Sequence, residues 1–269
     1  MTRRAESPAS DDTMETRLPT YPDLAAKTIL ITGGGSGIGA AFTQAFAQQR
    51  SRVAFVDNAE ETSQALVQRV TKETGNAPTF VPCDVCDIPA LQTAIEKVSS
   101  ELGDIAVLIN NAASDDRHAF DAVTHSYWDN RVAVNLRHMF FASQAVAYQM
   151  KRLGGGAMIN LGSIVWRLKD AALPVYSACK AAVIGLTRTQ AREYGPFGIR
   201  VNSISPGAVW TERQIKLWYT PEFERAVMNG QCLNARVLPE DIADMALFLA
   251  SDAASKCTAQ DFTVDAGWS

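Results

Sequence analysis

A tyrosine and a lysine four residues apart are the residues whose types and spacing most directly suggest chemistry. Tyr176 and Lys180 lie in a segment that we predict to be helical, so both side chains share one helix face. A free tyrosine has a pKa of about 10, which is too high for a proton acceptor at neutral pH, but an ammonium group within about 4–6 Å favours the phenolate. The pair therefore predicts a general base at Tyr176, although such spacing alone is common by chance.

Two other polar residues fit the same chemistry. Ser163 follows a predicted strand, where its hydroxyl can hydrogen-bond a substrate oxygen. Asn135 lies in an otherwise apolar helical stretch, and a buried amide must find partners. We expect Asn135 to hold a water near Lys180; the alternative is an amide that the protein itself satisfies.

A glycine cluster predicts a dinucleotide site. The run from Thr32 to Gly39 follows the first predicted strand and opens the first predicted helix, so its backbone can approach a pyrophosphate resting on free helix N–H groups. Asp57 ends the next strand, where a carboxylate accepts ribose hydroxyls and repels a 2′-phosphate. Ser36 and Asn58 are neutral, so the charges favour NAD over NADP.

The expected cofactor contacts of the first half of the chain share a position at strand ends. They are Gly33, Ser36, Gly37, Ile38, Gly39, Asp57, Asp84, Val85, Asn111 and Ala112. Three of them have structural alternatives: Asp57 as a capping residue, Asp84 as the start of a helix, and Asn111 as a turn residue.

These residues need a scaffold of alternating strands and helices. Short apolar runs at 27–32, 52–57, 77–83, 105–109, 156–161, 199–204 and 260–264 predict strands. Segments 40–49, 60–75, 88–102, 127–152, 175–194 and 240–250 predict helices. This alternation implies parallel strands joined by crossover helices, hence an α/β fold. We expect one catalytic domain over residues 23–269, a disordered tail over 1–22, and a lid over about 207–238.

Composition excludes several classes of function. The 269 residues are 47% hydrophobic and 20% charged, with a formal net charge of -4, which gives no general attraction to nucleic acid or anionic lipid. No apolar run reaches the roughly 18 residues that span a membrane. Five scattered cysteines suggest reduced thiols in the cytoplasm, with a Cys83–Cys86 redox or zinc pair as the alternative. The three histidines are too scattered to predict a metal site.

Together these residues resemble the short-chain dehydrogenase/reductase family over about residues 24–269. The matching motifs, in the family's order and approximate spacing, are Thr32-Gly33-x-x-x-Gly37-x-Gly39, Asn110-Asn111-Ala112, Asn135, Ser163, Tyr176-x-x-x-Lys180 and Pro206-Gly207. The resemblance implies a single Rossmann-type doubly wound α/β domain with a mostly parallel seven-stranded sheet and helices on both faces. It also implies a homotetramer or homodimer.

The family's residue roles transfer to matching positions. Tyr176 would be the general acid/base, Lys180 its electrostatic partner and ribose anchor, Ser163 the residue that orients the substrate, and Asn135 a support of the proton relay. The resemblance also implies a loop on the nicotinamide side of the cofactor, formed by Pro206, Gly207, Val209 and Thr211.

Further segments resemble bacterial pentose dehydrogenases of the D-xylose or L-arabinose 1-dehydrogenase kind, namely 111–118, 127–129, 134–141, 216–222 and 264–268. That likeness implies oxidation of the anomeric hydroxyl of an aldose to a lactone with NAD. The expected substrate residues are Asp115, Asp116, Trp166, Arg167, Trp210 and Trp218, because sugars need polar partners and aromatic faces. The alternatives are solvated or ion-paired charges, and tryptophans of the core or a subunit interface.

One departure leaves the substrate open. Arg167 stands where those dehydrogenases carry a histidine after a tryptophan, so we expect it to remodel the pocket or to favour an acidic substrate. Two other functions also stay open: a dehydrogenase of the same family acting on another secondary alcohol, hydroxyacyl or carbonyl compound, and a non-catalytic dinucleotide sensor.

Overall fold

The chain builds its fold around one sheet. A computed structural model describes residues 19–169 and 171–269, and in them seven strands pair in the order β3-β2-β1-β4-β5-β6-β7. Every pairing is parallel. The strands are β1 (Thr28–Thr32), β2 (Arg52–Asp57), β3 (Thr79–Pro82), β4 (Ile105–Asn110), β5 (Gly156–Leu161), β6 (Ile199–Pro206) and β7 (Asp261–Val264). The predicted α/β class and the parallel sheet are confirmed, and the sheet is wholly rather than mostly parallel in the described residues.

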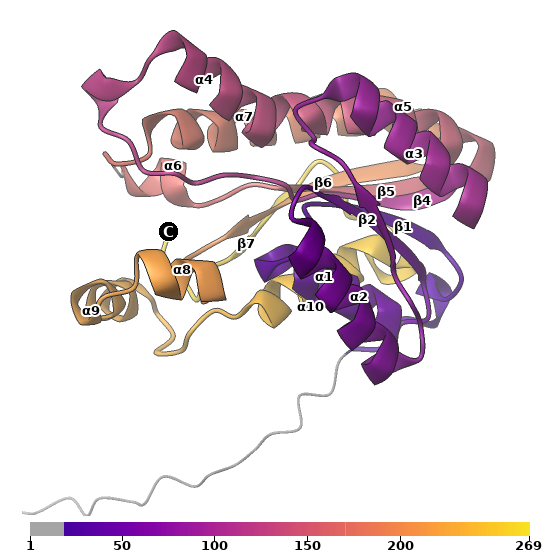
Figure 1. Cartoon of the computed structure of the whole chain (residues 1–269), viewed down its shortest axis with the longest axis horizontal. Helices are drawn as coiled ribbons and strands as arrows, with labels where there is room; N and C mark the ends of the chain where they lie inside the picture. The colour runs from indigo at the N-terminus through magenta and orange to yellow at the C-terminus, as the bar shows by residue number, and fades with distance from the viewer. Residues whose placement is uncertain (1–18, 170) are drawn as a thin grey trace, which may run out of the picture.

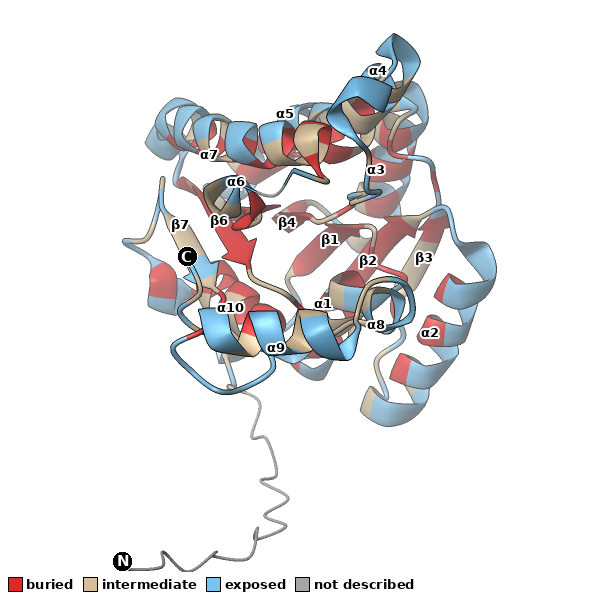
Figure 2. Cartoon of the chain, turned by 90° about the vertical axis from the view of Figure 1, so that its left-hand side faces the viewer, coloured by how far each residue is buried: buried red, intermediate tan, exposed pale blue. Residues whose placement is uncertain are grey.

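Helices cover both faces of the sheet (Figure 1). One layer holds α1 (Gly37–Gln48), α2 (Glu60–Thr74) and α10 (Pro239–Ala250), and the other holds α3 (Ile88–Leu102), α5 (His138–Leu153) and α7 (Pro174–Tyr194). On β1, Ile29 and Ile31 pack into the first layer's core, whereas Leu30 packs into the second. All five residues of β1 are buried, which explains why its sequence is apolar without alternation (Figure 2).

The strand order places the site. The chain leaves β1 toward β2 on one side and later returns to β4 on the other, so the crossovers diverge between these two strands. In an open parallel sheet, ligands bind in the crevice beyond the carboxyl ends of the strands at this point. Thr32 and Asn110, the last residues of β1 and β4, are register partners there.

Shorter helices occur in the connections between these strands and long helices. They are η1 (Pro22–Leu24), η2 (Phe120–Ala122), α4 (His125–Val132), η3 (Ala133–Arg137), α6 (Val165–Leu168), η4 (Gly195–Phe197), α8 (Glu212–Leu217), α9 (Pro221–Gly230) and η5 (Asp252–Ala254). The predicted irregular region near 207–238 therefore contains two helices, α8 and α9. No helix in the described ranges is both long and apolar enough to cross a membrane.

The structure departs from two predicted segments in more than the exact position of an end. The helix predicted over 127–152 is divided into α4 and α5 by η3, a π-helical turn that contains Asn135. Residues 1–18 of the predicted tail lie outside the described residues, whereas Pro19 and Tyr21 are hydrogen-bonded to the domain. The Gln49 side chain accepts a hydrogen bond from the Tyr21 amide at 2.8 Å and donates one to the Pro19 carbonyl at 2.9 Å.

Candidate active site

The glycine loop after β1 is built for close approach. Gly33 has a φ of 64°, which favours glycine, and a Cβ on Gly39 would lie 1.8 Å from the Gly33 carbonyl oxygen. Ser36 caps α1 without a side-chain bond to the helix, so the N–H groups of the first turn remain available to an anion. This tightly packed loop at a helix start fits the pyrophosphate of a dinucleotide.

Asp57 lies beside this loop at the end of β2. One carboxylate oxygen accepts a hydrogen bond from the Gly35 amide at 2.9 Å, and the other accepts from the Ala59 amide at 2.9 Å. A carboxylate offers about four acceptor positions, so two remain for ribose hydroxyls. Asp57 thus fixes the loop and still fits the predicted ribose contact.

The other strand-end residues hold turns. The Asn111 side chain donates to the carbonyls of Thr32 and Gly33, at 3.1 and 2.7 Å, and the Asp84 carboxylate accepts from the Cys86 amide at 2.9 Å. The structural alternative therefore holds for Asn111, whereas the helix start expected at Asp84 was wrong, because Asp87 is the N-cap of α3. Ala112 and Val85, which follow β4 and β3, are buried.

The segment after β6 returns to the glycine loop. Pro206 ends β6, and a Cβ on Gly207 would lie 2.8 Å from the Asp265 backbone. A Cβ on Gly37 would lie 3.4 Å from the Thr211 side chain, so Thr211 is adjacent to the loop. Among the predicted nicotinamide-side residues, Thr211 thus lies next to the glycine loop and Val209 is buried.

Three side chains meet at the carboxyl edge of β5. A side-chain hydrogen bond with Ser163 acts to lower the pKa of Tyr176. The Lys180 ammonium lies 5.5 Å from the centre of the Tyr176 ring and donates a 2.6 Å hydrogen bond to the Leu161 carbonyl. Lys180 is 1% exposed, so this ammonium is held in place by the last residue of β5.

Burial changes the proton affinities of this group. Burial raises the pKa of Tyr176, and Asp115 raises it further, whereas Ser163 and Arg213 lower it. Burial also lowers the pKa of Lys180 to about 8. In the protein alone the pKa of Tyr176 is raised rather than lowered, because burial, the largest cause, disfavours the phenolate.

Asn135 is satisfied by the backbone of one residue. Its side-chain oxygen accepts from the Ser114 amide at 2.9 Å, and its amide group donates to the Ser114 carbonyl at 3.1 Å. The side chain thus connects η3 with the loop that follows β4. The structural alternative, an amide that the protein itself satisfies, therefore describes Asn135.

The predicted acidic substrate residues form a charged network. Asp115 pairs with Arg213 and accepts from the side chain of Gln214, both on α8. Asp116 pairs with Arg213 at 3.2 Å and with Arg131 of α4 at 2.7 Å. The ion-pair alternative therefore describes both acids, and the charge of Asp115 raises the pKa of Tyr176.

Two of the predicted tryptophans, Trp210 and Trp218, pack against other side chains in the segment after β6, whereas Trp166 lies on α6. Trp210 packs on Tyr219, with ring centres 4.0 Å apart. The Arg117 guanidinium lies over Trp218, 4.4 Å from the centre of its ring. Trp166 is on α6 and is 38% exposed.

Arg167 lies beside Trp166, with its guanidinium 5.0 Å from the centre of the ring. The guanidinium also pairs with Asp261 of β7 at 2.9 Å and donates to the Ser269 hydroxyl. These contacts favour the alternative of an ion-paired charge.

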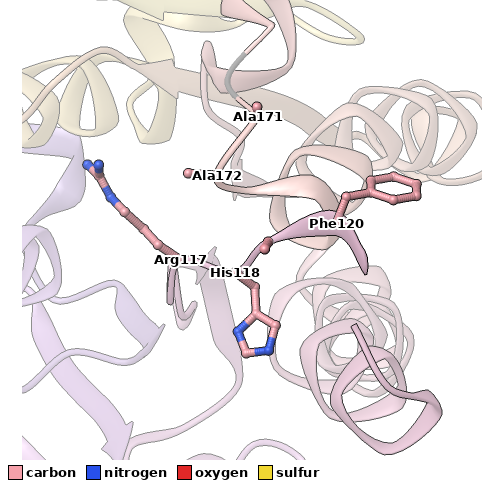
Figure 3. Close-up of a pocket in the computed structure, with 6 residues that line it drawn as sticks. Arg117, His118, Phe120, Ala171 and Ala172 are labelled. Atoms are coloured by element: carbon pink, nitrogen blue, oxygen red, sulfur yellow. The ribbon is translucent and has the colours of Figure 1, made fainter. Parts of the chain in front are cut away.

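An open hollow lies beside these residues. It has a volume of about 550 Å³ and lies between the segment 117–120 and residues 171–172 (Figure 3). Arg117 and His118 point in different directions from the first segment, His118 stacking on Tyr127 at 3.9 Å. Ser163, Tyr176 and Lys180 do not line this hollow, so it is not the reacting part of the site.

Sequence reasoning missed the α8 residues that face the site. Arg213 and Gln214 contact Asp115 across almost a hundred positions of sequence, and no local pattern identifies such a partner. Opposite charge was the one available signal, but the chain has many alternative pairs. Cys83 and Cys86 are free, and burial raises the pKa of Cys83 to about 11, which disfavours a reactive thiolate.

Comparisons with known proteins agree with this geometry. Residues 33–269 match the family model described as enoyl-(acyl carrier protein) reductase. A D-xylose 1-dehydrogenase of Caulobacter vibrioides is 50% identical over 248 residues, covering 92% of this chain and 98% of the relative. A Rhizobium meliloti protein described as "Probable galactose dehydrogenase" is 47% identical over 247 residues, covering 92% and 96%.

A solved structure extends the comparison to the fold. A 7α-hydroxysteroid dehydrogenase complexed with NADH and 7-oxo glycochenodeoxycholic acid has a TM-score of 0.87 and 31% identity, covering 92% of this chain and 96% of the other. The chain belongs to the short-chain dehydrogenase/reductase family. Within that family it is an oxidoreductase that uses a nicotinamide dinucleotide and acts on a small sugar or alcohol.

Proposed function

We propose that this protein oxidises an aldose at C1 to a lactone with NAD. The observation that carries the proposal is the joining of Ser163, Tyr176 and Lys180 at the crevice that holds the glycine loop. The likeness to the xylose and galactose enzymes supports a sugar as the substrate.

The proposed roles follow from where each group lies. The Tyr176 phenol oxygen, after losing its own proton, takes the proton of the C1 hydroxyl as that hydroxyl becomes a carbonyl. The Ser163 hydroxyl donates a hydrogen bond to the same substrate oxygen, and Lys180 supplies positive charge and a ribose contact. The bound dinucleotide supplies the hydride acceptor and a positively charged ring. The protein contributes placement and electrostatics.

The preference for NAD rests on Asp57. Its carboxylate is anchored by two backbone amides beside the glycine loop, so it would repel a 2′-phosphate from a fixed position. Ser36 and Asn58 offer that phosphate no positive charge.

The proposed sugar site lies between the loop after β4 and the segment 207–238, which we infer to be a lid. Asp115 has acceptor capacity beyond its two α8 partners, and Trp210 and Trp218 offer aromatic faces. The indole N–H groups of both tryptophans are buried and have no hydrogen-bond partner, which suits a polar ligand or water.

The test is a panel of aldoses and secondary alcohols assayed with NAD and with NADP. We expect NADH formation with an aldose, preference for NAD, and a lactone as the product. Tyr176→Phe should lower kcat by at least about 100-fold while NADH still binds and the protein stays folded. Turnover that survives in Tyr176→Phe would contradict the mechanism, and activity with ketones and NADH alone would favour another family substrate.

We also propose a homotetramer or homodimer. Phe140 and Tyr148 on α5 are 49% and 65% exposed, and a further hollow of about 270 Å³ lies between α4 and α7, lined by Trp128 and Leu136 among others. Such an apolar surface suits a subunit contact. Light scattering measures the assembly directly. The five free cysteines suit a reducing compartment such as the cytoplasm.

A further inference from the structure

Arg213 connects two parts of the chain that flank the crevice. It lies on α8, in the segment between β6 and α10, and its guanidinium reaches Asp115 and Asp116 in the loop after β4. Its neighbour Gln214 donates to the same Asp115 carboxylate. Two consecutive side chains of α8 therefore hold one acid from the opposite side of the site.

Asp115 is close enough to the reacting groups to affect them. Besides burial, which is the main cause, Asp115 raises the pKa of Tyr176, and Arg213 acts in the opposite direction. Asp115 also raises the pKa of Lys180, against the larger lowering that burial causes. An unpaired Asp115 would thus oppose the phenolate on which the proposed oxidation depends.

The pair is joined to a second ion pair. Arg131 of α4 bonds to Asp116 at 2.7 Å and also to the Ser114 hydroxyl, and the Ser114 backbone is held by Asn135. The polar and charged groups that surround Asp115 are therefore Arg213, Gln214, Asp116, Arg131, Tyr176 and Lys180. Among the positive groups of the described residues, Arg213 is the one that contacts Asp115 directly.

We propose that Arg213 is a positioning residue of this enzyme, holding α8 against the loop after β4 and keeping the Asp115 carboxylate paired beside Tyr176. The proposal rests on the proposed sugar oxidation, because it assigns to Asp115 the role of accepting a substrate hydroxyl. Arg213 compensates the charge of Asp115 while leaving acceptor positions free. No catalytic step passes through Arg213 itself.

The expected energetic signature is local. Arg213 is 48% exposed and the two acids are 22% and 51% exposed, and exposed ion pairs contribute little to global stability. Loss of Arg213 should therefore leave the Tm nearly unchanged but loosen α8 and release Asp115. Loss of a surface charge without a positioning role would neither loosen α8 nor release Asp115.

The test compares Arg213→Gln with Arg225→Gln in the full chain. Arg225 lies in the same segment, on α9, and pairs with Glu222 three residues earlier. The Arg225→Gln variant therefore removes the same charge at a place away from the site. In Arg213→Gln we expect amide hydrogen exchange over 212–217 to become about 3- to 10-fold faster. We also expect the KM for the aldose to rise about 3- to 10-fold, with NADH binding unchanged.

The pH profile gives a second readout. Removing Arg213 should move the rising limb of log kcat/KM for oxidation to higher pH, by about 0.5 unit, because the pKa of Tyr176 rises. Adding Asp115→Asn should move that limb back while the KM stays high. Arg213→Lys keeps the charge, so it should restore the limb but only part of the exchange protection.

Equal exchange over 212–217 in the Arg213→Gln and Arg225→Gln variants would overturn the proposal. An unchanged pH limb in Arg213→Gln would overturn it as well. If the wild-type protein oxidised no aldose, the proposed function would fail, and the exchange comparison would still decide whether Arg213 holds α8.

Discussion

The guanidinium of Arg167 and the carboxylate of Asp261 form an ion pair, with a nitrogen–oxygen distance of 2.9 Å, between α6 and β7. The same carboxylate accepts hydrogen bonds from the hydroxyls of Ser203 and Ser205 on β6. Since α6 follows Ser163 directly, this pair ties the serine's loop to the edge of the sheet.

Replacing Arg167 should therefore affect stability more than substrate choice. We expect Arg167→Met to lower the free energy of unfolding by about 1 kcal/mol, a small value because the arginine is about one third exposed. Urea unfolding measures this change. The ranking of aldoses by kcat/KM should stay as in the wild type, and Arg167→His should not alter it either. A new preference for uncharged over acidic sugars in either variant would show that Arg167 does influence the substrate pocket.

Two glycine-to-alanine variants should affect different properties of the protein, NADH binding in one and stability in the other. In Gly39→Ala the new methyl group would lie 1.8 Å from the Gly33 carbonyl, so we expect NADH binding to weaken by at least about 10-fold. Gly185 lies inside α7 with nothing within 4 Å of an added Cβ. Gly185→Ala should stabilise the protein by about 0.5–1 kcal/mol with binding unchanged. Fluorescence titration with NADH and thermal unfolding measure the two effects; normal NADH affinity in Gly39→Ala would refute the predicted role of the loop.

Asp57 should decide between the two dinucleotides. Asp57→Asn keeps an acceptor for the Gly35 amide but loses the charge, so the ratio of kcat/KM for NAD to that for NADP should fall about 10- to 100-fold. Asp84→Asn is the matched control, because Asp84 also follows closely on a strand and accepts a backbone amide. Its effect should be the same for both cofactors. An unaltered ratio in Asp57→Asn would show that another group selects the cofactor.

His138 should make stability depend on pH. Burial lowers the pKa of His138 to about 4, and its ring bonds to the Ala112 carbonyl at 3.0 Å. An unfolded histidine has a pKa of about 6.5, so below that pH the unfolded chain binds the extra proton first. The stabilisation is present above about pH 6.5 and is lost as the pH falls toward 4.

The measurement is the free energy of unfolding of wild type and His138→Gln at pH 7.5 and pH 5. The difference between the two proteins should shrink by about 1–2 kcal/mol at the lower pH, because only the wild type titrates at this position. His125→Gln makes the same substitution on an exposed residue of α4 and serves as the control. A difference that stays constant between the two pH values would contradict the prediction.

Local patterns predicted the scaffold well. The strands at 52–57 and 156–161 and the helix at 88–102 were predicted with the bounds that the structure has, because fully apolar runs and glycine ends are local signals. The π turn at Asn135 was not predictable, since it depends on how that amide meets the Ser114 backbone. A continuous helix and an interrupted one have the same periodicity over so short a distance.

By itself, the sequence determined the α/β class, the parallel sheet and the types of residue at the strand ends, because backbone conformation follows the order of apolar, glycine and polar residues along the chain. Tertiary structure alone decided the partners of the charges. Arg213 meets Asp115, and Arg167 meets Asp261, across more than ninety residues, and many other pairs have the same signs. Charge attracts at any separation in sequence, so only packing determines which opposite charges come within bonding distance.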